Sequence, residues 1–207
     1  MLKNIFRIIN AYQFSLVIVI FFEFLYLIKG YKGNRFNFSK NHSMTDNIPC
    51  PYYFLFKIKN TLQKYSFSNF IDFGCGSGRA INFFSQNSFS KNYIGIEYFS
   101  EQYEYCKRIF KNNKNINIIQ GDFTKLDFLK YKPDCYYFNG PFKNGEEFIR
   151  FLEKIVNFSI EKNIFFIFIN CNKKVVEKIE KIEKIKYIEK FYVSKTTGYS
   201  IFSLPSV

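Results

Sequence analysis

Strand-like and helical segments alternate from residue 51 onward, and this alternation limits the chain to few folds. The strand-like runs are NFIDF, NYIGIEY, INIIQGD, DCYYFN and IFFIFIN. Between and after them, residues 79–86, 100–112, 144–158 and 173–184 have helical character, and Ser100 stands at an N-cap position. This pattern predicts an α/β fold with a parallel, doubly wound sheet. Ligands of such sheets bind beyond the carboxyl ends of the strands.

Residues 49–207 are predicted to form one domain. Residues 51–65 have the pattern of a helix, and YIEKFYVSK and YSIFSLP read as two closing β-strands. With 47% apolar residues in a chain of 207, a domain of this size can bury a full core.

The N-terminal region is predicted to lie outside this domain. Residues 1–30 contain the most apolar run, FSLVIVIFFEFLYLI (14–28), and residues 31–48 are polar and aperiodic, as in a linker or flap. The run is short for a membrane span and carries Glu23 at its middle. We expect an apolar helix that packs on the domain or touches a membrane surface through residues 5–28. A true anchor is the second alternative and a signal peptide the third.

The formal net charge of +13 allows two kinds of partner, nucleic acid and an anionic membrane surface. The lysines are spread along the chain, and Lys, Asn, Ile, Phe and Tyr are all abundant. Because these residues have A/T-rich codons, a bias in base composition is the favoured explanation of the charge.

Cysteine and histidine are too sparse for several kinds of site. The five cysteines are far apart and form no C-x-x-C pair, and His42 is the single histidine. This pattern disfavours a disulfide framework, a zinc site and a Ser-His-Asp triad. We expect buried thiols in a reducing, cytoplasmic compartment and no metal.

The motif IDFGCGSGR (71–79) spans the end of the first predicted strand and the start of the next predicted helix. Its glycines, Gly74, Gly76 and Gly78, alternate after Asp72. Glycine lets backbone N–H groups and a helix N-terminus approach a ligand closely. The spacing differs from the G-x-G-x-x-G of dinucleotide enzymes, so a tight structural turn is the alternative.

Two more acidic residues end the next two predicted strands. Glu97 can accept hydrogen bonds from a ribose diol, and Asp122 can accept from an exocyclic amine beside the apolar face of Phe123. Parallel strands bring these ends to one edge of the sheet, so we expect both acids to lie beside the glycine loop.

With these motifs, residues 49–207 resemble the class I S-adenosylmethionine-dependent methyltransferases. The resemblance implies a three-layer Rossmann-like sheet, mostly parallel, with seven strands of which the last is antiparallel. It implies S-adenosyl-L-methionine as cofactor. The implied binding residues are Asp72, Gly74, Cys75, Gly76, Gly78, Glu97, Asp122 and Phe123. Asp72 and the glycine loop would hold the methionine end, Glu97 the ribose hydroxyls, and Asp122 with Phe123 the adenine.

The fourth strand ends in NGPF (139–142), which resembles a motif of amino-group methyltransferases. There the Asn139 carbonyl and a backbone carbonyl would accept from the target amine, while Pro141 and Phe142 complete the catalytic set. Gly140 departs from the motif, and a loop that merely ends a strand is the alternative.

These features predict methyl transfer to an amine nitrogen of a protein or small molecule. One alternative is an RNA or DNA adenine N6-methyltransferase, for which the basic charge would help to hold RNA. Another is a non-catalytic cofactor-binding partner protein. An aminopropyl transferase on the same fold lacks the expected acidic polyamine-binding cluster.

Overall fold

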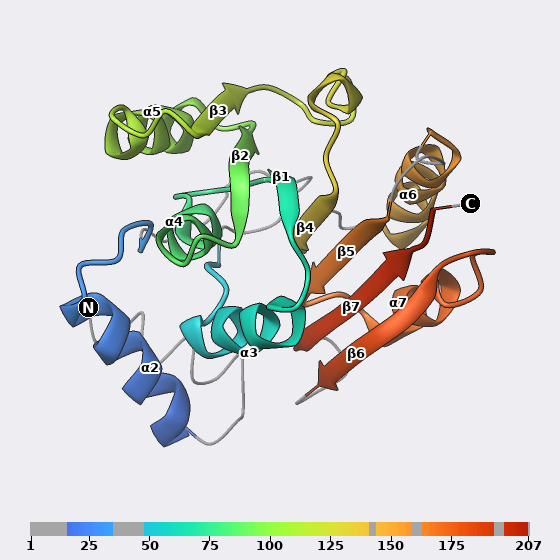
Figure 1. Cartoon of the computed structure of the whole chain (residues 1–207), viewed down its shortest axis with the longest axis horizontal. Helices are drawn as coiled ribbons and strands as arrows, with labels where there is room; N and C mark the ends of the chain where they lie inside the picture. Colours follow the sequence, from blue (N-terminus) through green and yellow to red (C-terminus); the bar gives the residue numbers. More distant parts are fainter. Residues whose placement is uncertain (1–15, 35–47, 141–143, 159–162, 193–196, 207) are drawn as a thin grey trace.

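A computed structural model describes residues 16–34, 48–140, 144–158, 163–192 and 197–206. At its centre lies a seven-stranded sheet with the order β3-β2-β1-β4-β5-β7-β6 (Figure 1). The strands are β1 (Phe67–Phe73), β2 (Ser90–Glu97), β3 (Ile116–Gln120), β4 (Cys135–Asn139), β5 (Ile164–Ile169), β6 (Lys186–Tyr192) and β7 (Gly198–Leu204).

The sheet is mostly parallel and reverses its direction of growth between β1 and β4. β1 pairs in parallel with both β2 and β4. β7 lies between β5 and β6 and is antiparallel to both. The predicted Rossmann-like sheet with an antiparallel last strand is therefore confirmed. Ligands of such sheets bind at the reversal, where the loops after β1 and β4 diverge.

Helices cover both faces of the sheet, which gives three layers (Figure 1). The helices are α2 (Leu16–Ile28), α3 (Tyr52–Leu62), α4 (Arg79–Gln86), α5 (Ser100–Phe110), the short 3-10 helix η1 (Leu129–Tyr131), α6 (Gly145–Phe158) and α7 (Lys173–Ile179). Buried residues of α2, α3, α4 and α5 form one apolar core with the sheet. Those of α6 and α7 form the second core on the opposite face.

A row of phenylalanine rings crosses the second core. Phe73, Phe138 and Phe168 stand on the adjacent strands β1, β4 and β5, and their rings stack with centroids 5.0 and 5.4 Å apart. Phe202 on β7 continues the row at 5.8 Å from Phe168. All four rings are buried, so aromatic contacts between strands add to the apolar area removed from water.

The structure corrects two local predictions. Ser100 is the first helical residue of α5, and the N-cap is Phe99, which makes no side-chain capping bond. α7 ends at Ile179 although the helical pattern continues to residue 184. Lys184 has a φ of +73°, a left-handed conformation that a helix cannot contain. At the start of α7, Asn172 is the N-cap, and its side chain accepts a hydrogen bond from the Lys174 N–H.

The apolar N-terminal run forms α2, and one side of this helix packs on the domain. The Tyr26 ring lies 4.8 Å from the Tyr52 ring of α3 and 5.3 Å from the Phe83 ring of α4. In the part of the chain that the structure describes, no helix has the length and apolarity needed to cross a bilayer. Residues 1–15 and 35–47 of the predicted N-terminal segments lie outside the described residues.

Candidate functional site

The glycine loop joins the end of β1 to the start of α4, as the sequence predicts. Gly74, Gly76 and Gly78 have φ values of +73°, +55° and +77°, a region that disfavours any residue with a Cβ. A Cβ at Gly74 would face open space, whereas one at Gly78 would lie 2.6 Å from the Phe110 ring. Gly74 therefore leaves room on the open side of the loop, and Gly78 allows close packing on the inner side.

The inner side of the loop rests on β2 and α5. Cys75 is buried there, and the Cys106 thiol donates to the Gly76 carbonyl oxygen at 3.0 Å. Gly95 of β2 lies directly below, because an added Cβ would come within 2.8 Å of the Cys75 sulfur. The Cys75 side chain thus packs between the loop and β2. Only the Cys75 backbone forms part of the loop surface.

Asp72 and Glu97 form a buried acidic pair at the ends of β1 and β2. Their exposed fractions are 2% and 5%. Burial raises the pKa of Asp72 well above its ordinary value, and repulsion by Glu97 adds to this. Burial also raises the pKa of Glu97, although backbone N–H groups partly offset it. Two carboxyl groups that are costly to ionise together favour a cationic ligand, which would compensate their charge.

Glu97 also holds the glycine loop. One carboxylate oxygen accepts from the Gly76 N–H at 2.7 Å and the other from the Phe99 N–H at 2.8 Å. A carboxylate has about four acceptor sites, so these bonds leave capacity for ligand hydroxyls. The sequence indicated the acid and its strand end but not its contact with the loop.

Asp122 and Phe123 follow β3 at the same edge of the sheet. One Asp122 oxygen accepts from both the N–H and the hydroxyl of Thr124, and Lys125 lies 3.5 Å from the other. Burial raises the pKa of Asp122, but the Thr124 bonds and the Lys125 charge outweigh it and lower the pKa overall. The Phe123 ring is half-buried and packs on Phe73 at 5.2 Å.

Asn139 ends β4, one strand away from Asp72. Its amide nitrogen donates to the Ile48 carbonyl at 2.9 Å, and its side-chain oxygen accepts from the Asn170 amide at 3.2 Å. An amide oxygen has two lone pairs, so it can also accept from a substrate amine. Pro141 and Phe142 lie outside the described residues, and their predicted roles remain predictions.

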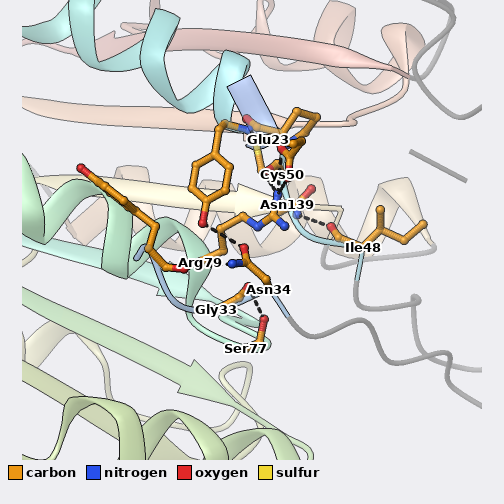
Figure 2. Close-up of polar contacts among 11 residues, drawn as sticks. Glu23, Gly33, Asn34, Ile48, Cys50, Ser77, Arg79 and Asn139 are labelled. Carbon is orange, nitrogen blue, oxygen red and sulfur yellow. Dashed lines mark hydrogen bonds and ion pairs between the residues drawn. The ribbon is translucent and has the colours of Figure 1, made fainter. Parts of the chain in front are cut away.

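The glycine loop and the start of α4 are also contacted by α2 and the residues that follow it (Figure 2). Arg79, directly after the last loop glycine, pairs with Glu23 of α2 at 2.8 Å. The Ser77 hydroxyl donates to the Gly33 carbonyl at 2.6 Å. Sequence reasoning used Glu23 only as an obstacle to a membrane span. A lone acid within an apolar helix was the available signal that it has a buried basic partner.

Comparison with known proteins agrees with this geometry. A family model described as "Methyltransferase domain" matches residues 70–158, a range that includes the glycine loop, both buried acids and Asn139. A search of the curated proteins finds none that matches the chain.

Solved methyltransferase structures share the fold. The N-methyltransferase NodS from Bradyrhizobium japonicum, in complex with S-adenosyl-L-homocysteine, is 11% identical, with a TM-score of 0.56 over 72% of this chain and 83% of that one. A SAM-dependent methyltransferase from Aquifex aeolicus is 15% identical (TM-score 0.53, 70% and 88% covered). The tRNA methyltransferase TrmK of B. subtilis is 14% identical (TM-score 0.54, 74% and 65% covered). At these identities the likeness shows the fold alone.

The domain match and the Rossmann-like sheet define a class of enzymes that use S-adenosyl-L-methionine. The chain contains a methyltransferase domain, and its sheet has the fold of S-adenosylmethionine-dependent methyltransferases. The residues at its sheet edge fit this cofactor, because the buried acidic pair suits a ligand with a sulfonium and an ammonium group. The open side of Gly74 also leaves space for the ligand.

Proposed function

We propose that the enzyme transfers the methyl group to an amine nitrogen of a protein or small molecule. The observation that carries this proposal is the place of Asn139. Register pairs Asp72 with Tyr137 and Phe73 with Phe138, so Asn139 follows directly on the strand beside the glycine loop. An amide oxygen there can accept an N–H of the target amine and direct its lone pair toward the methyl.

The proposed cofactor contacts follow the strand ends. Asp72 would pair with the ammonium of the methionine moiety, whose carboxylate would face the N–H groups at the start of α4. Glu97 would accept from the ribose hydroxyls, and Asp122 with Phe123 would border the adenine. Cys75 would contribute through its backbone.

The chemistry asks little more of the protein than position and the exclusion of water. A sulfonium methyl is already activated, so in-line attack depends on proximity and orientation. A neutral amine needs no base at the moment of attack, which suits Asn139, because its amide side chain is not a base. A hydroxyl nucleophile would need a base or a metal, which makes an amine the better match.

Methyl transfer from labelled S-adenosyl-L-methionine into a cell lysate tests this proposal. We expect label on protein or small molecules, so that protease or filtration removes it and RNase does not. Label that RNase removes would instead favour the adenine N6 alternative. If the protein binds the cofactor but labels nothing in any lysate fraction, the non-catalytic alternative gains.

We further propose that the outer face of α2 rests on an anionic lipid surface. This face is apolar and exposed, formed by Val17, Phe21, Phe24 and Ile28. The one acid of α2, Glu23, is turned inward to Arg79, while Lys29 and Lys32 are exposed just after the helix. An uncharged apolar face beside basic residues suits the border between acyl chains and anionic headgroups. The enzyme would then be cytoplasmic and associated with a membrane surface.

Sedimentation with lipid vesicles tests this surface. We expect the protein to pellet with vesicles that contain phosphatidylserine and to be released by salt. A Phe21→Ser, Phe24→Ser variant should lose most of this binding, whereas Tyr187→Ser, which removes an exposed ring on β6, should not. Equal behaviour of the variant and the parent would contradict the proposal.

A further inference from the structure

Glu23 ties the N-terminal helix to two helices of the methyltransferase domain. Nη1 of Arg79, at the start of α4, donates to both Glu23 carboxylate oxygens at 3.0 and 2.8 Å. The Tyr52 N–H, at the start of α3, donates to the same carboxylate at 3.0 Å. The Glu23 and Arg79 side chains are 16% and 4% exposed. The pair is therefore largely shielded from water, and removing one charge leaves the other uncompensated.

The chain after α2 presses on the end of the glycine loop. A Cβ on Gly33 would lie 2.4 Å from the Arg79 backbone nitrogen, so the two backbones touch. The Gly33 carbonyl also accepts a hydrogen bond from the Ser77 hydroxyl at 2.6 Å (Figure 2), and the Lys32 N–H donates to the Asn82 side chain at 2.6 Å. These directional contacts fix the position of the loop in a way that apolar packing alone would not.

The ion pair and the acidic end of β1 share one buried region. The Cys50 carbonyl accepts from Arg79 Nη1 at 3.2 Å. Burial raises the pKa of the Cys50 thiol to about 12; the Arg79 charge lowers it, while Glu23 and Asp72 raise it. The charges of Arg79, Glu23 and Asp72 thus all act on this one buried thiol. An uncompensated guanidinium here would oppose any cation bound at Asp72, because charges interact strongly where water is excluded.

We infer that Glu23 is a positioning residue for the cofactor, which holds the glycine loop in place and neutralises Arg79, a cation that would otherwise oppose the ammonium proposed at Asp72. The inference rests on the proposed placement of the cofactor at Asp72 and the glycine loop. It makes α2 part of the cofactor site, although no residue of α2 need touch the cofactor.

The charge of the ligand separates this role from a merely structural one. S-adenosyl-L-methionine carries the ammonium proposed at Asp72, whereas 5′-methylthioadenosine keeps the adenosine part but has no amino-acid moiety. In Glu23→Gln we expect the Kd for S-adenosyl-L-methionine to rise at least about tenfold and that for 5′-methylthioadenosine less than about threefold. Calorimetry of both ligands with the full chain measures this. Glu146→Gln, which breaks an exposed pair with Lys178 on the other face of the sheet, should change neither.

A double variant keeps the test decisive if Glu23→Gln does not fold. Glu23→Gln, Arg79→Gln buries no unpaired charge, and we expect it to restore the parent ratio of the two affinities. The inference would be overturned if Glu23→Gln weakened the binding of both ligands equally, or if the double variant did not restore the parent ratio of the two affinities. Either result would leave the proposed cofactor site standing. A parent protein that binds neither ligand would overturn the proposed site together with the inference.

Discussion

Replacing Asp72 by Asn is expected to weaken S-adenosyl-L-methionine binding by at least about 100-fold. The same change is expected to make the cofactor-free protein more stable, by about 1 kcal/mol near neutral pH. Both effects have one cause. The Asp72 carboxyl is buried beside Glu97 and is costly to ionise without a cation. Its removal therefore stabilises the cofactor-free protein and weakens binding of the cationic cofactor.

The raised pKa values set the pH dependence of this effect. The folded-state pKa of Asp72 lies above its unfolded value, so the cost of ionisation is absent at low pH and grows as pH rises through the folded-state pKa. The stability gain of Asp72→Asn should therefore grow with pH. Cofactor binding to the parent should release protons and tighten over the same range.

Urea unfolding across pH, together with calorimetry in buffers of different ionisation enthalpy, measures both effects. Asp127→Asn is the matched control, since Asp127 is exposed and lies in the loop after β3. A variant at Asp72 that binds the cofactor as tightly as the parent would exclude the proposed contact with the ammonium.

Asn139→Ala is expected to lower kcat by about 100-fold while changing cofactor affinity by less than about twofold. The side chain would orient the amine and takes no part in the proposed cofactor contacts. Loss of its bond to Ile48 also removes one link to residues 48–50, so the melting temperature should be measured alongside.

Single-turnover methyl transfer, with the cofactor Kd measured separately, distinguishes orientation from binding. Asn172→Ala is the matched control, because it removes an asparagine nearby whose side chain caps α7. That control should cost about 1 kcal/mol of stability and leave the rate per folded molecule unchanged. A full rate in Asn139→Ala would mean that NGPF only ends a strand.

The fold was accessible from the sequence because its elements are locally consistent. Strand runs and helical spacings alternate without conflict, and Arg79–Gln86 was predicted with both its ends. The errors lie at ends, where local signals are weakest. The KKVVEKIEKIEK pattern continues past Ile179, but the chain must turn there to enter β6, and tertiary packing overrides the periodicity.

The candidate site was accessible only where it depends on strand ends. Asp72 and Glu97 could be placed because parallel strands bring their carboxyl ends together. The contact of Glu97 with the Gly76 N–H and the pairing of Glu23 with Arg79 could not, since each depends on side-chain geometry between segments distant in sequence. The alternatives for the acceptor stay open because NGPF does not encode its substrate.

The row of Phe73, Phe138, Phe168 and Phe202 has a consequence for how this enzyme can evolve. Each ring stands on a different strand, and Phe138 and Phe168 each pack between two other rings of the row. A substitution such as Phe138→Leu leaves a gap on both sides of one position, and close-packed interiors refill poorly. Because a larger ring at a neighbouring position would overpack the core just as a smaller side chain leaves a gap, positions along the row are expected to change together.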